Sequence, residues 1–357
     1  MSGPQTNGAG AGAGSGSGSD VPEAQLQRRF DLGAWEGMHR IAGGKSAHHI
    51  LTTDRGRFVL RRSYRAKEEC AVAFEHELVA HLRRGGFPGP EFVPTVDGRP
   101  CAVIDGRLWR VSVLVEADPA DGTNPAHVEA AGASLGRYHR LVETFRPAGR
   151  VPEAAFLPDA LAERLAAVRT LVDDPVLSPG DRGYELLGAL RGAVDEGAGA
   201  AARLGHLYDR MPMTLIHAGC RRGSVLFRGD RLAVVLDFDS SRYEAKAYDV
   251  AVAVHDFAKI YGDPGSDDFK VHLDPGVAGA FVSAYESEGG RLSSEELEAV
   301  PLLLVAKRLK RALGRYGRLL AGEPLSDNDL RKINLELARV RSLGAPGGVA
   351  EALAVRS

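Results

Sequence analysis

Cysteine is scarce in this sequence of 357 residues, with only Cys70, Cys101 and Cys220, which are odd in number and widely spaced. This pattern fits a reducing compartment better than a disulfide framework, and it shows no metal-site spacing. An excess of one charge sign is also absent, since the formal net charge is −2. We therefore expect no nucleic-acid partner and no attraction to an anionic membrane.

Long apolar runs are missing as well. One of the longest, Val300–Ala306, is far shorter than a membrane-spanning helix. Gly, Ala and Ser dominate the first 20 residues, which have no apolar core and so are neither a signal peptide nor a span. We expect residues 1–24 to form a flexible tail and the protein to be cytoplasmic. The abundance of Ala, Gly and Arg suits a GC-rich bacterial genome.

What is present is a β-rich part followed by a helical one. A short amphipathic segment at Gln25–Gly37 precedes two predicted hairpins, His49–Thr53 with Arg57–Arg62 and Ala102–Ile104 with Leu108–Val115. A helix over Lys67–Arg84 lies between them and ends at a Gly pair. Later helices are predicted from their apolar spacing over His127–Thr144, Leu157–Leu171, Tyr184–Leu207, Tyr248–Tyr261, Val277–Glu286, Ser294–Leu320 and Ser326–Leu343.

This order predicts an α+β chain with a small antiparallel-sheet N-lobe and a larger, mainly helical C-lobe. The connector Glu116–Gly122 marks the boundary. We expect an N-lobe over residues 25–117, a C-lobe over 118–345 and a flexible C-terminus over 346–357.

The most informative stretch is Thr-Leu-Ile-His-Ala-Gly-Cys-Arg-Arg-Gly-Ser-Val-Leu, at residues 214–226. An apolar run leads into His217, and a later apolar run at Leu232–Leu236 delivers Asp237-Phe238-Asp239. The arrangement resembles the aminoglycoside phosphotransferase and choline kinase family, whose loop typically runs His-Gly-Asp-x-His-x-x-Asn-Val-Leu and whose closing strand ends in Ile-Asp-Trp. The resemblance covers roughly residues 35–345 and implies a protein-kinase-like two-lobe fold.

Laid on the family pattern, His217 matches the first His and Asp237 matches the metal-binding Asp. Gly219 stands where the family has its catalytic Asp, and Ser224 where it has its metal-binding Asn. The resemblance thus implies ATP or GTP with Mg²⁺ as cofactor, and Asp237 and Ser224 as metal ligands. A turn-forming Asp is the alternative for Asp237. Asp249, in the family's Tyr-Asp pair, is expected to brace the loop, and the alternative is that it caps the helix that starts there.

The nucleotide would be held mainly by the N-lobe. Resemblance implies that Arg61 contacts the phosphates and pairs with Glu75. The alternatives are a solvated strand residue for Arg61 and an ordinary surface residue for Glu75. The loop that ends at Ser46 would cover the phosphates with backbone N–H groups. The adenine would contact the hinge backbone at Leu114, Val115 and Glu116.

Two cations, Arg221 and Arg222, stand where the family has His and commonly Pro or another small residue. They would neutralise transferring charge, hold a phosphorylated ligand, take the place of the metal, or simply be solvated. Asp239 would stand in for the missing base. The candidate catalytic residues are therefore His217, Arg221, Arg222 and Asp239.

Three functions follow from this pattern. Loss of a general base costs roughly 10²–10⁴-fold in rate, which favours a protein that keeps a nucleotide or ligand site but has an impaired or repurposed phosphotransfer centre, with a protein partner. The second is an active ATP-dependent O-phosphotransferase on a small-molecule or peptide hydroxyl, in antibiotic resistance or natural-product metabolism. The third uses the Arg pair on a phosphorylated substrate, for example in phosphate elimination.

Overall fold

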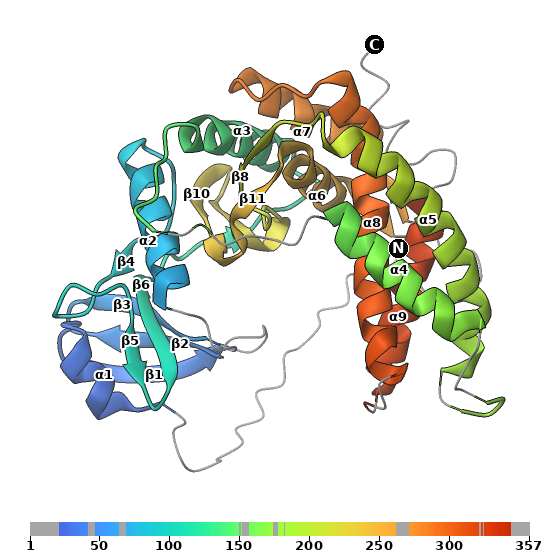
Figure 1. Cartoon of the computed structure of the whole chain (residues 1–357). Helices are drawn as coiled ribbons and strands as arrows, with labels where there is room; N and C mark the ends of the chain where they lie inside the picture. The colour runs from blue at the N-terminus through green and yellow to red at the C-terminus, as the bar shows by residue number, and fades with distance from the viewer. Residues whose placement is uncertain are drawn as a thin grey trace, which may run out of the picture. The chain divides into compact units, whose positions relative to one another are not determined.

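The computed structural model describes residues 21–41, 47–63, 69–149, 151, 157–173, 178–181, 183–261, 271–320, 323 and 325–343. The chain divides into two compact units (Figure 1). The first comprises Met1–Ala66 and Val93–Val111, and the second Lys67–Phe92 and Ser112–Ser357. The antiparallel sheet in the N-terminal region and the helical C-terminal region confirm the expected α+β class.

The first unit is built on a sheet with the strand order β1-β2-β3-β6-β4, and β5 pairs with β6. The short helix α1 precedes the sheet. Both predicted hairpins are confirmed, as β2 with β3 and β5 with β6. The bounds are α1 Glu23–Arg29, β1 Trp35–Ile41, β2 Ala47–Thr53, β3 Gly56–Arg62, β4 Phe92–Val93, β5 Ala102–Ile104 and β6 Arg107–Val113.

Alternation along β3 separates two arginines that are adjacent in sequence. Phe58 and Leu60 are buried on one face of the strand, and Arg61 lies on the other face, opposite His48 of β2. Arg62 instead lies with its guanidinium 5.8 Å from the centre of the Trp109 ring. This cation–π contact gives Arg62 a structural role.

The second unit contains the remaining elements. Its helices are α2 Glu69–Arg84, α3 Pro125–Val142, α4 Leu157–Asp173, α5 Leu187–Tyr208, α6 Lys246–Ala258, α7 Pro275–Ser287, α8 Ser294–Leu320 and α9 Asp327–Leu343, with short 3₁₀ turns η1 Tyr184–Leu186, η2 Arg222–Ser224 and η3 Phe238–Ser240. Its strands are β7 Asp118–Pro119, β8 Met213–Ile216, β9 Val225–Arg228, β10 Arg231–Val235, β11 Arg242–Ala245, β12 Lys259–Tyr261 and β13 Val271–Leu273.

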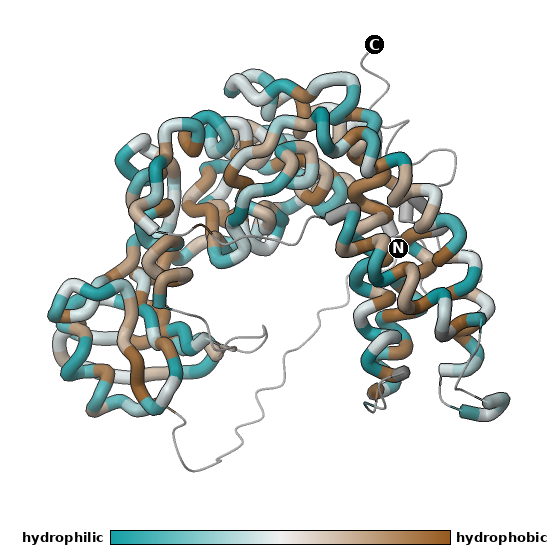
Figure 2. The backbone as a smooth tube through the Cα atoms, in the orientation of Figure 1, coloured by the Kyte–Doolittle hydropathy of each residue, from teal (hydrophilic) through white to brown (hydrophobic). Residues whose placement is uncertain are grey.

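Helix α6 forms the centre of this unit. Eleven of its residues are buried, so the helix is enclosed on nearly every side. Apolar and polar residues instead alternate along α4, α5 and α8, as Figure 2 shows, which is typical of helices with one packed face. The predicted helix over residues 248–261 ends earlier, at Ala258, because Lys259–Tyr261 pairs with Val271–Leu273 as a small hairpin.

Helices α3 and α7 pack unusually closely. A Cβ atom on Gly132 or Gly136 of α3 would overlap the backbone carbonyl oxygens of Phe281 and Tyr285 of α7. Only glycine permits this approach. The seam brings Tyr285 against His139 of α3, with 2.9 Å between the Tyr285 hydroxyl and His139 Nδ1.

Helix α2 groups with the second unit, whereas the expected N-lobe of residues 25–117 includes it. Its side chains explain this grouping. Phe74 makes an edge-to-face contact with Phe145 at 6.0 Å between ring centres. Phe87, just after the helix, makes another with Tyr138 at 6.1 Å. Among the described helices, none is both long and apolar enough to cross a bilayer.

Candidate active site

The residues 217–224, which we call the His217 loop, follow strand β8. The backbone at the start of this loop is held by one carboxylate. Asp249 of α6 is fully buried and accepts hydrogen bonds from the backbone N–H groups of His217, at 2.7 Å, and Ala218, at 2.9 Å. His139 Nε2 donates to the same carboxylate at 3.3 Å. Burial by itself would raise the pKa of Asp249, but these hydrogen bonds and the nearby His139 lower it overall. Asp249 is therefore an ionised brace for the loop, as expected.

His217 supports the same loop from within. Its side chain is 1% exposed, and Nδ1 accepts the backbone N–H of Gly219 at 3.1 Å. The ring packs 4.6 Å from the Phe238 ring. Burial lowers the pKa of His217, although Asp249 and Asp237 oppose the shift. A neutral imidazole that accepts a backbone hydrogen bond is suited to holding the loop.

Gly219 is predicted to stand at the position of the family's catalytic carboxylate, and it has no side chain. A Cβ atom built there would lie 3.3 Å from the Asp237 carbonyl oxygen and 3.3 Å from His217 Nδ1. These contacts are tight, and the φ of Gly219 lies outside the left-handed region. An aspartate at position 219 therefore requires only small shifts of its neighbours.

Asp237 lies at the end of β10 in a left-handed conformation, with φ 67° and ψ 45°. Its side chain is exposed, and within the described part of the chain it makes neither a hydrogen bond nor an ion pair. Asp239, on η3, is half-buried. The negative charges of Asp237 and Asp239 act to raise the pKa of His217, against the larger lowering effect of burial. Mg²⁺ typically uses one or two carboxylates together with phosphate oxygens and water. This pair suits such an ion.

Ser224 closes the loop onto itself. Its hydroxyl is 2.6 Å from the Gly219 carbonyl oxygen and 3.0 Å from that of Arg221, and it accepts the Arg221 N–H at 3.0 Å. The residue is 2% exposed. Because a hydroxyl has a single proton and is already an acceptor here, metal binding by Ser224 would compete with loop closure. Its role as a ligand stays a prediction.

The two loop arginines differ. The Arg222 backbone N–H donates to Asp256 Oδ2 at 2.9 Å, and its Nε lies 3.9 Å from the same oxygen. Asp256 also pairs with Lys259. Arg221, in contrast, has no carboxylate within 4.0 Å of its guanidinium among the described residues. Arg222 is thus anchored in the protein, and Arg221 is available to a ligand.

The expected nucleotide residues fall in different parts of the chain. Glu75 is 3% exposed, which excludes the surface alternative for this residue. Arg61 belongs to the first unit and Glu75 to the second, so their pairing stays a prediction. Ser46 and residues 42–45 of the loop before it lie outside the described residues.

The hinge has free backbone groups. Beyond β6, the N–H and C=O groups of Leu114 and Val115 make no hydrogen bond with any described residue. The Glu116 carbonyl oxygen instead accepts from Arg228 Nε at 2.8 Å. The expected adenine contacts at Leu114 and Val115 therefore have donors and acceptors to use, and Glu116 offers fewer.

Several residues near the loop escape sequence reasoning. His139 and Tyr285 complete the Asp249 network, and Asp256 holds Arg222. The basic run Lys307-Arg308-Leu309-Lys310-Arg311 in α8 was a usable signal, because like charges rarely crowd a packed helix without a reason. The described residues contain no cluster of three or more His, Cys, Asp or Glu side chains suited to a metal.

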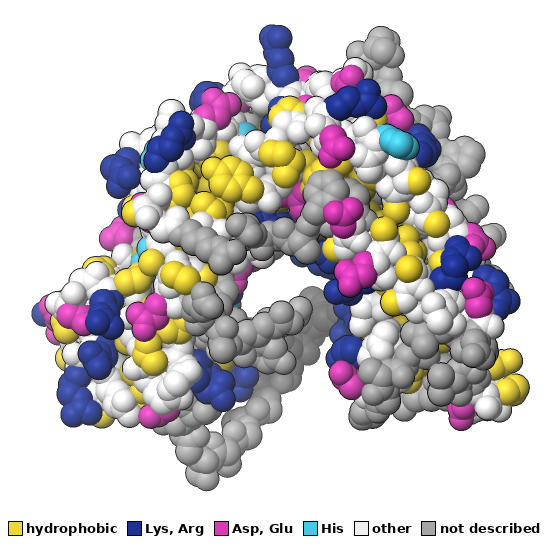
Figure 3. All heavy atoms as spheres, viewed as in Figure 1, with side chains coloured by type: hydrophobic (Ala, Val, Ile, Leu, Met, Phe, Trp, Pro, Cys, Tyr) yellow, Lys and Arg dark blue, Asp and Glu magenta, His cyan; other side chains and the backbone are white. Residues whose placement is uncertain are grey.

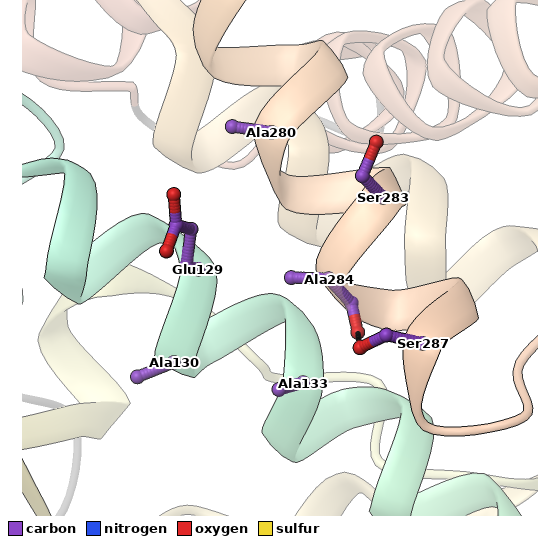
Figure 4. A pocket seen from close by; sticks show the side chains of 7 residues that line it. All are labelled: Glu129, Ala130, Ala133, Ala280, Ser283, Ala284 and Ser287. Atoms are coloured by element: carbon purple, nitrogen blue, oxygen red, sulfur yellow. Dashed lines mark hydrogen bonds between the residues drawn. The ribbon is translucent and has the colours of Figure 1, made fainter.

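A shallow groove of about 490 Å³ lies on the α3–α7 seam, apart from these groups. Figure 4 shows its lining, which is Glu129 with the small residues Ala130, Ala133, Ala280, Ser283, Ala284 and Ser287. Apart from Glu129 it presents small side chains, and it shares no residue with the His217 loop.

The chain is similar to homoserine kinases: that of Beijerinckia indica is 28% identical over 287 residues, covering 80% of this chain and 82% of the relative. The homoserine kinase of Rhodopseudomonas palustris is 26% identical over 345 residues, covering 92% and 96%.

Solved structures share the fold at low identity. An aminoglycoside phosphotransferase from Alicyclobacillus acidocaldarius has a TM-score of 0.66 at 18% identity, covering 96% of this chain and 98% of that one. An amicoumacin kinase in complex with AMP-PNP and Ca²⁺ has a TM-score of 0.65 at 13% identity, covering 93% and 97%. The profile of the phosphotransferase enzyme family matches residues 38–293. The chain belongs to the phosphotransferase enzyme family.

Proposed function

We propose that this protein is an ATP-dependent O-phosphotransferase that acts on a small-molecule hydroxyl without a side-chain base at position 219. The observation that carries the proposal is the pairing of a fixed loop with a free carboxylate. Asp249 holds the backbone of His217 and Ala218, and Asp237 is exposed without a described partner. Ala218 and Asp237 are both in left-handed conformations, which cost about 1–2 kcal/mol each and cluster at functional sites.

The residues present suit a magnesium nucleotide. Asp237 would hold the metal, with Asp239 beside it, Arg61 would hold the phosphates, and the backbone of Leu114 and Val115 would bind the base. Bound ATP with Mg²⁺ supplies the phosphoryl group and neutralises its charge. GTP is the alternative nucleotide. A cytoplasmic location, expected from the sequence, would provide both nucleotide and metal.

Phosphoryl transfer demands little of a base, because its transition state is loose and largely dissociative. The chain's own contribution would be to position the acceptor hydroxyl and to keep the His217 loop rigid. Without a carboxylate at Gly219, we expect transfer to be slower by roughly 10²–10⁴-fold than with one. The impairment expected from the sequence is then one of rate.

A small hydroxy amino acid is the acceptor class to test first, because the relatives named homoserine kinase match most of the chain. L-Homoserine is therefore the first probe. An aminoglycoside and a serine-containing peptide test the wider class of hydroxyl acceptors.

The test is an assay of phosphorylated product with ATP and Mg²⁺ for wild type, Gly219→Asp and Asp237→Ala. We expect Mg²⁺-dependent product from wild type, loss in Asp237→Ala and a rise of about 10²–10⁴-fold in Gly219→Asp. Absence of product from both wild type and Gly219→Asp, with every acceptor, contradicts the proposal.

A nucleotide-binding protein without turnover, acting on a protein partner, is the second candidate. The observation in its favour is that the Ser224 hydroxyl is already used inside the loop. A ligand that binds the folded state raises the melting temperature by mass action. A Mg²⁺-dependent shift with ATP in wild type, together with no product from Gly219→Asp, would select this function.

A further inference from the structure

The basic face of α8 is only partly neutralised by the protein. Arg308 donates to Glu336 at 3.1 Å and lies 3.2 Å from His255 Nδ1. Lys307 and Arg311 have no carboxylate within 4.0 Å among the described residues. These two residues are four apart in the helix and so share one face.

Arg221 of the His217 loop joins these two residues electrostatically. Burial lowers the pKa of Lys307 and of Arg311, and the positive charge of Arg221 lowers both pKa values further. The three form what we call the cation cluster: Arg221, Lys307 and Arg311. The loop and α8 both contact α6, so these like charges lie on elements that share one neighbour.

The ring of Tyr248 fixes one side of the cluster. The Lys307 ammonium lies 5.7 Å from the ring centre, and the Arg242 guanidinium lies 5.1 Å from it. Tyr248 precedes Asp249, which braces the His217 loop. Lys307 is thus held beside the Tyr248 ring by a weak cation–π contact and not by a counter-charge.

This arrangement is costly for the protein alone. Lys307 is 8% exposed, and keeping a charge buried without a partner is costly for the fold. Asp256 is the carboxylate that acts on Lys307, but it is already bound to Lys259 and to the backbone of Arg222. Both charge signs are interspersed over the face shown in Figure 3.

We propose that Arg221, Lys307 and Arg311 form an anion-binding subsite beside the His217 loop, which takes the carboxylate or phosphate group of the acceptor substrate. The assignment to an acceptor rests on the proposed function, whereas anion binding itself does not. Arginine binds such groups in a bidentate way, and lysine adds a point charge.

The subsite restricts the substrate class. Arg221 is two residues from Gly219, so an anion held by the cluster lies next to the centre at which a hydroxyl must be presented. A small hydroxy acid or a phosphorylated alcohol meets this requirement. A polycationic sugar does not, because the cluster would repel it.

The experiment is calorimetric titration of the full chain without nucleotide, using inorganic phosphate, L-homoserine and L-homoserinamide, the amide that lacks the carboxylate. The variants are Arg221→Gln, Lys307→Met and Arg311→Gln. Arg318→Gln is the matched control, because Arg318 lies on the same helix but pairs with Glu323 and Asp329. Circular dichroism verifies folding of each variant.

We expect phosphate or L-homoserine to bind wild type and Arg318→Gln equally, and each cluster variant to bind at least tenfold more weakly. Binding of L-homoserine but not its amide identifies a carboxylate ligand, and binding of phosphate alone identifies a phosphorylated one. Equal affinity in the cluster variants, or no binding of either anion to wild type, overturns the subsite.

The two proposals fail separately. Anion binding that depends on the cluster, without phosphorylated product, rejects the phosphotransferase and keeps the subsite. Product formation that is the same for L-homoserine and its amide, and unchanged in Arg221→Gln, rejects the subsite and keeps the phosphotransferase.

Discussion

The floor of the His217 loop, by which we mean Asp249 with its hydrogen-bond donors, and the cation cluster are both charged regions of the second unit. They differ in whether the protein itself supplies partners for the charge. On the floor, Asp249 is surrounded by donors from His139, His217 and Ala218. In the cluster, Arg221, Lys307 and Arg311 have no described carboxylate within ion-pair distance. A charged group whose partners lie within the protein holds the fold together, and charged groups without such partners are left to bind a ligand. Substitutions should therefore destabilise the floor and stabilise the cluster.

The largest effect is expected on the floor. Asp249→Ala leaves two backbone N–H groups and His139 without their acceptor in a buried place. We expect the free energy of unfolding to fall by about 3–5 kcal/mol, as for other broken buried pairs. Urea denaturation measures this. Asp237→Ala is the matched control, and a loss of similar size there would remove the distinction between a bracing and a ligand-binding carboxylate.

In contrast to Asp249, a buried carboxylate that accepts too few hydrogen bonds should contribute to stability only while it is protonated. Glu244 of β11 is 3% exposed and accepts only the Ala245 N–H at 3.2 Å, with Arg242 3.8 Å away. Burial raises its pKa from 4.5 to about 7. Because the folded-state pKa is the higher one, this group's contribution to stability is complete below pH 4.5 and is lost as the pH rises through 7.

Glu244→Gln should therefore be more stable than wild type at pH 8, by about 3 kcal/mol, and close to wild type at pH 4.5. Melting temperatures at the two pH values measure the difference. A Glu244→Gln variant whose advantage does not grow with pH would show that burial leaves this carboxylate ionised in the folded state.

The cluster should gain stability when it loses charge. Lys307→Met keeps most of the side-chain volume and removes an unpaired buried ammonium, so we expect unfolding to become harder by about 1–2 kcal/mol. The matched control is Arg308→Met, which breaks the bonds to Glu336 and should destabilise. If both substitutions act in the same direction, pairing does not separate the two regions.

The smallest effect concerns backbone strain in the loop. Ala218 has φ 62°, and glycine adopts this conformation without the steric cost. After the added chain entropy, Ala218→Gly should stabilise by about 0.5–1 kcal/mol. Thermal denaturation tests this against Ala251→Gly in α6, which should destabilise by about 1 kcal/mol. Destabilisation in both would mean that the loop relaxes around position 218.

Local patterns were enough to predict much of the fold. Helix α8 spans Ser294–Leu320, as its apolar spacing indicated, and the strands around the His217 loop lie within a residue or two of their expected bounds. Strand β1 was missed, because Trp35–Ile41 has little apolar character of its own and is stabilised by pairing with β2.

The site was less predictable, because neighbours in sequence have different partners in space. Arg221 and Arg222 look equivalent in the chain, and only Asp256, 34 residues after Arg222, separates their roles. The family resemblance, confirmed by the match to residues 38–293, led to the predictions for Asp237 and Gly219, which stay predictions. It did not indicate that Ser224 bonds to the carbonyl of Gly219, since that contact depends on the loop's own closure.

The close packing of α3 against α7 determines the position of the His217 loop. Its contact is backbone against backbone at Gly132 and Gly136, so its spacing is not adjustable by exchanging one apolar side chain for another. The chain of contacts from Tyr285 through His139 to Asp249 then transmits that spacing to His217. A single methyl group added at the seam should therefore act as a spacer, which shifts the loop without touching any residue of the site.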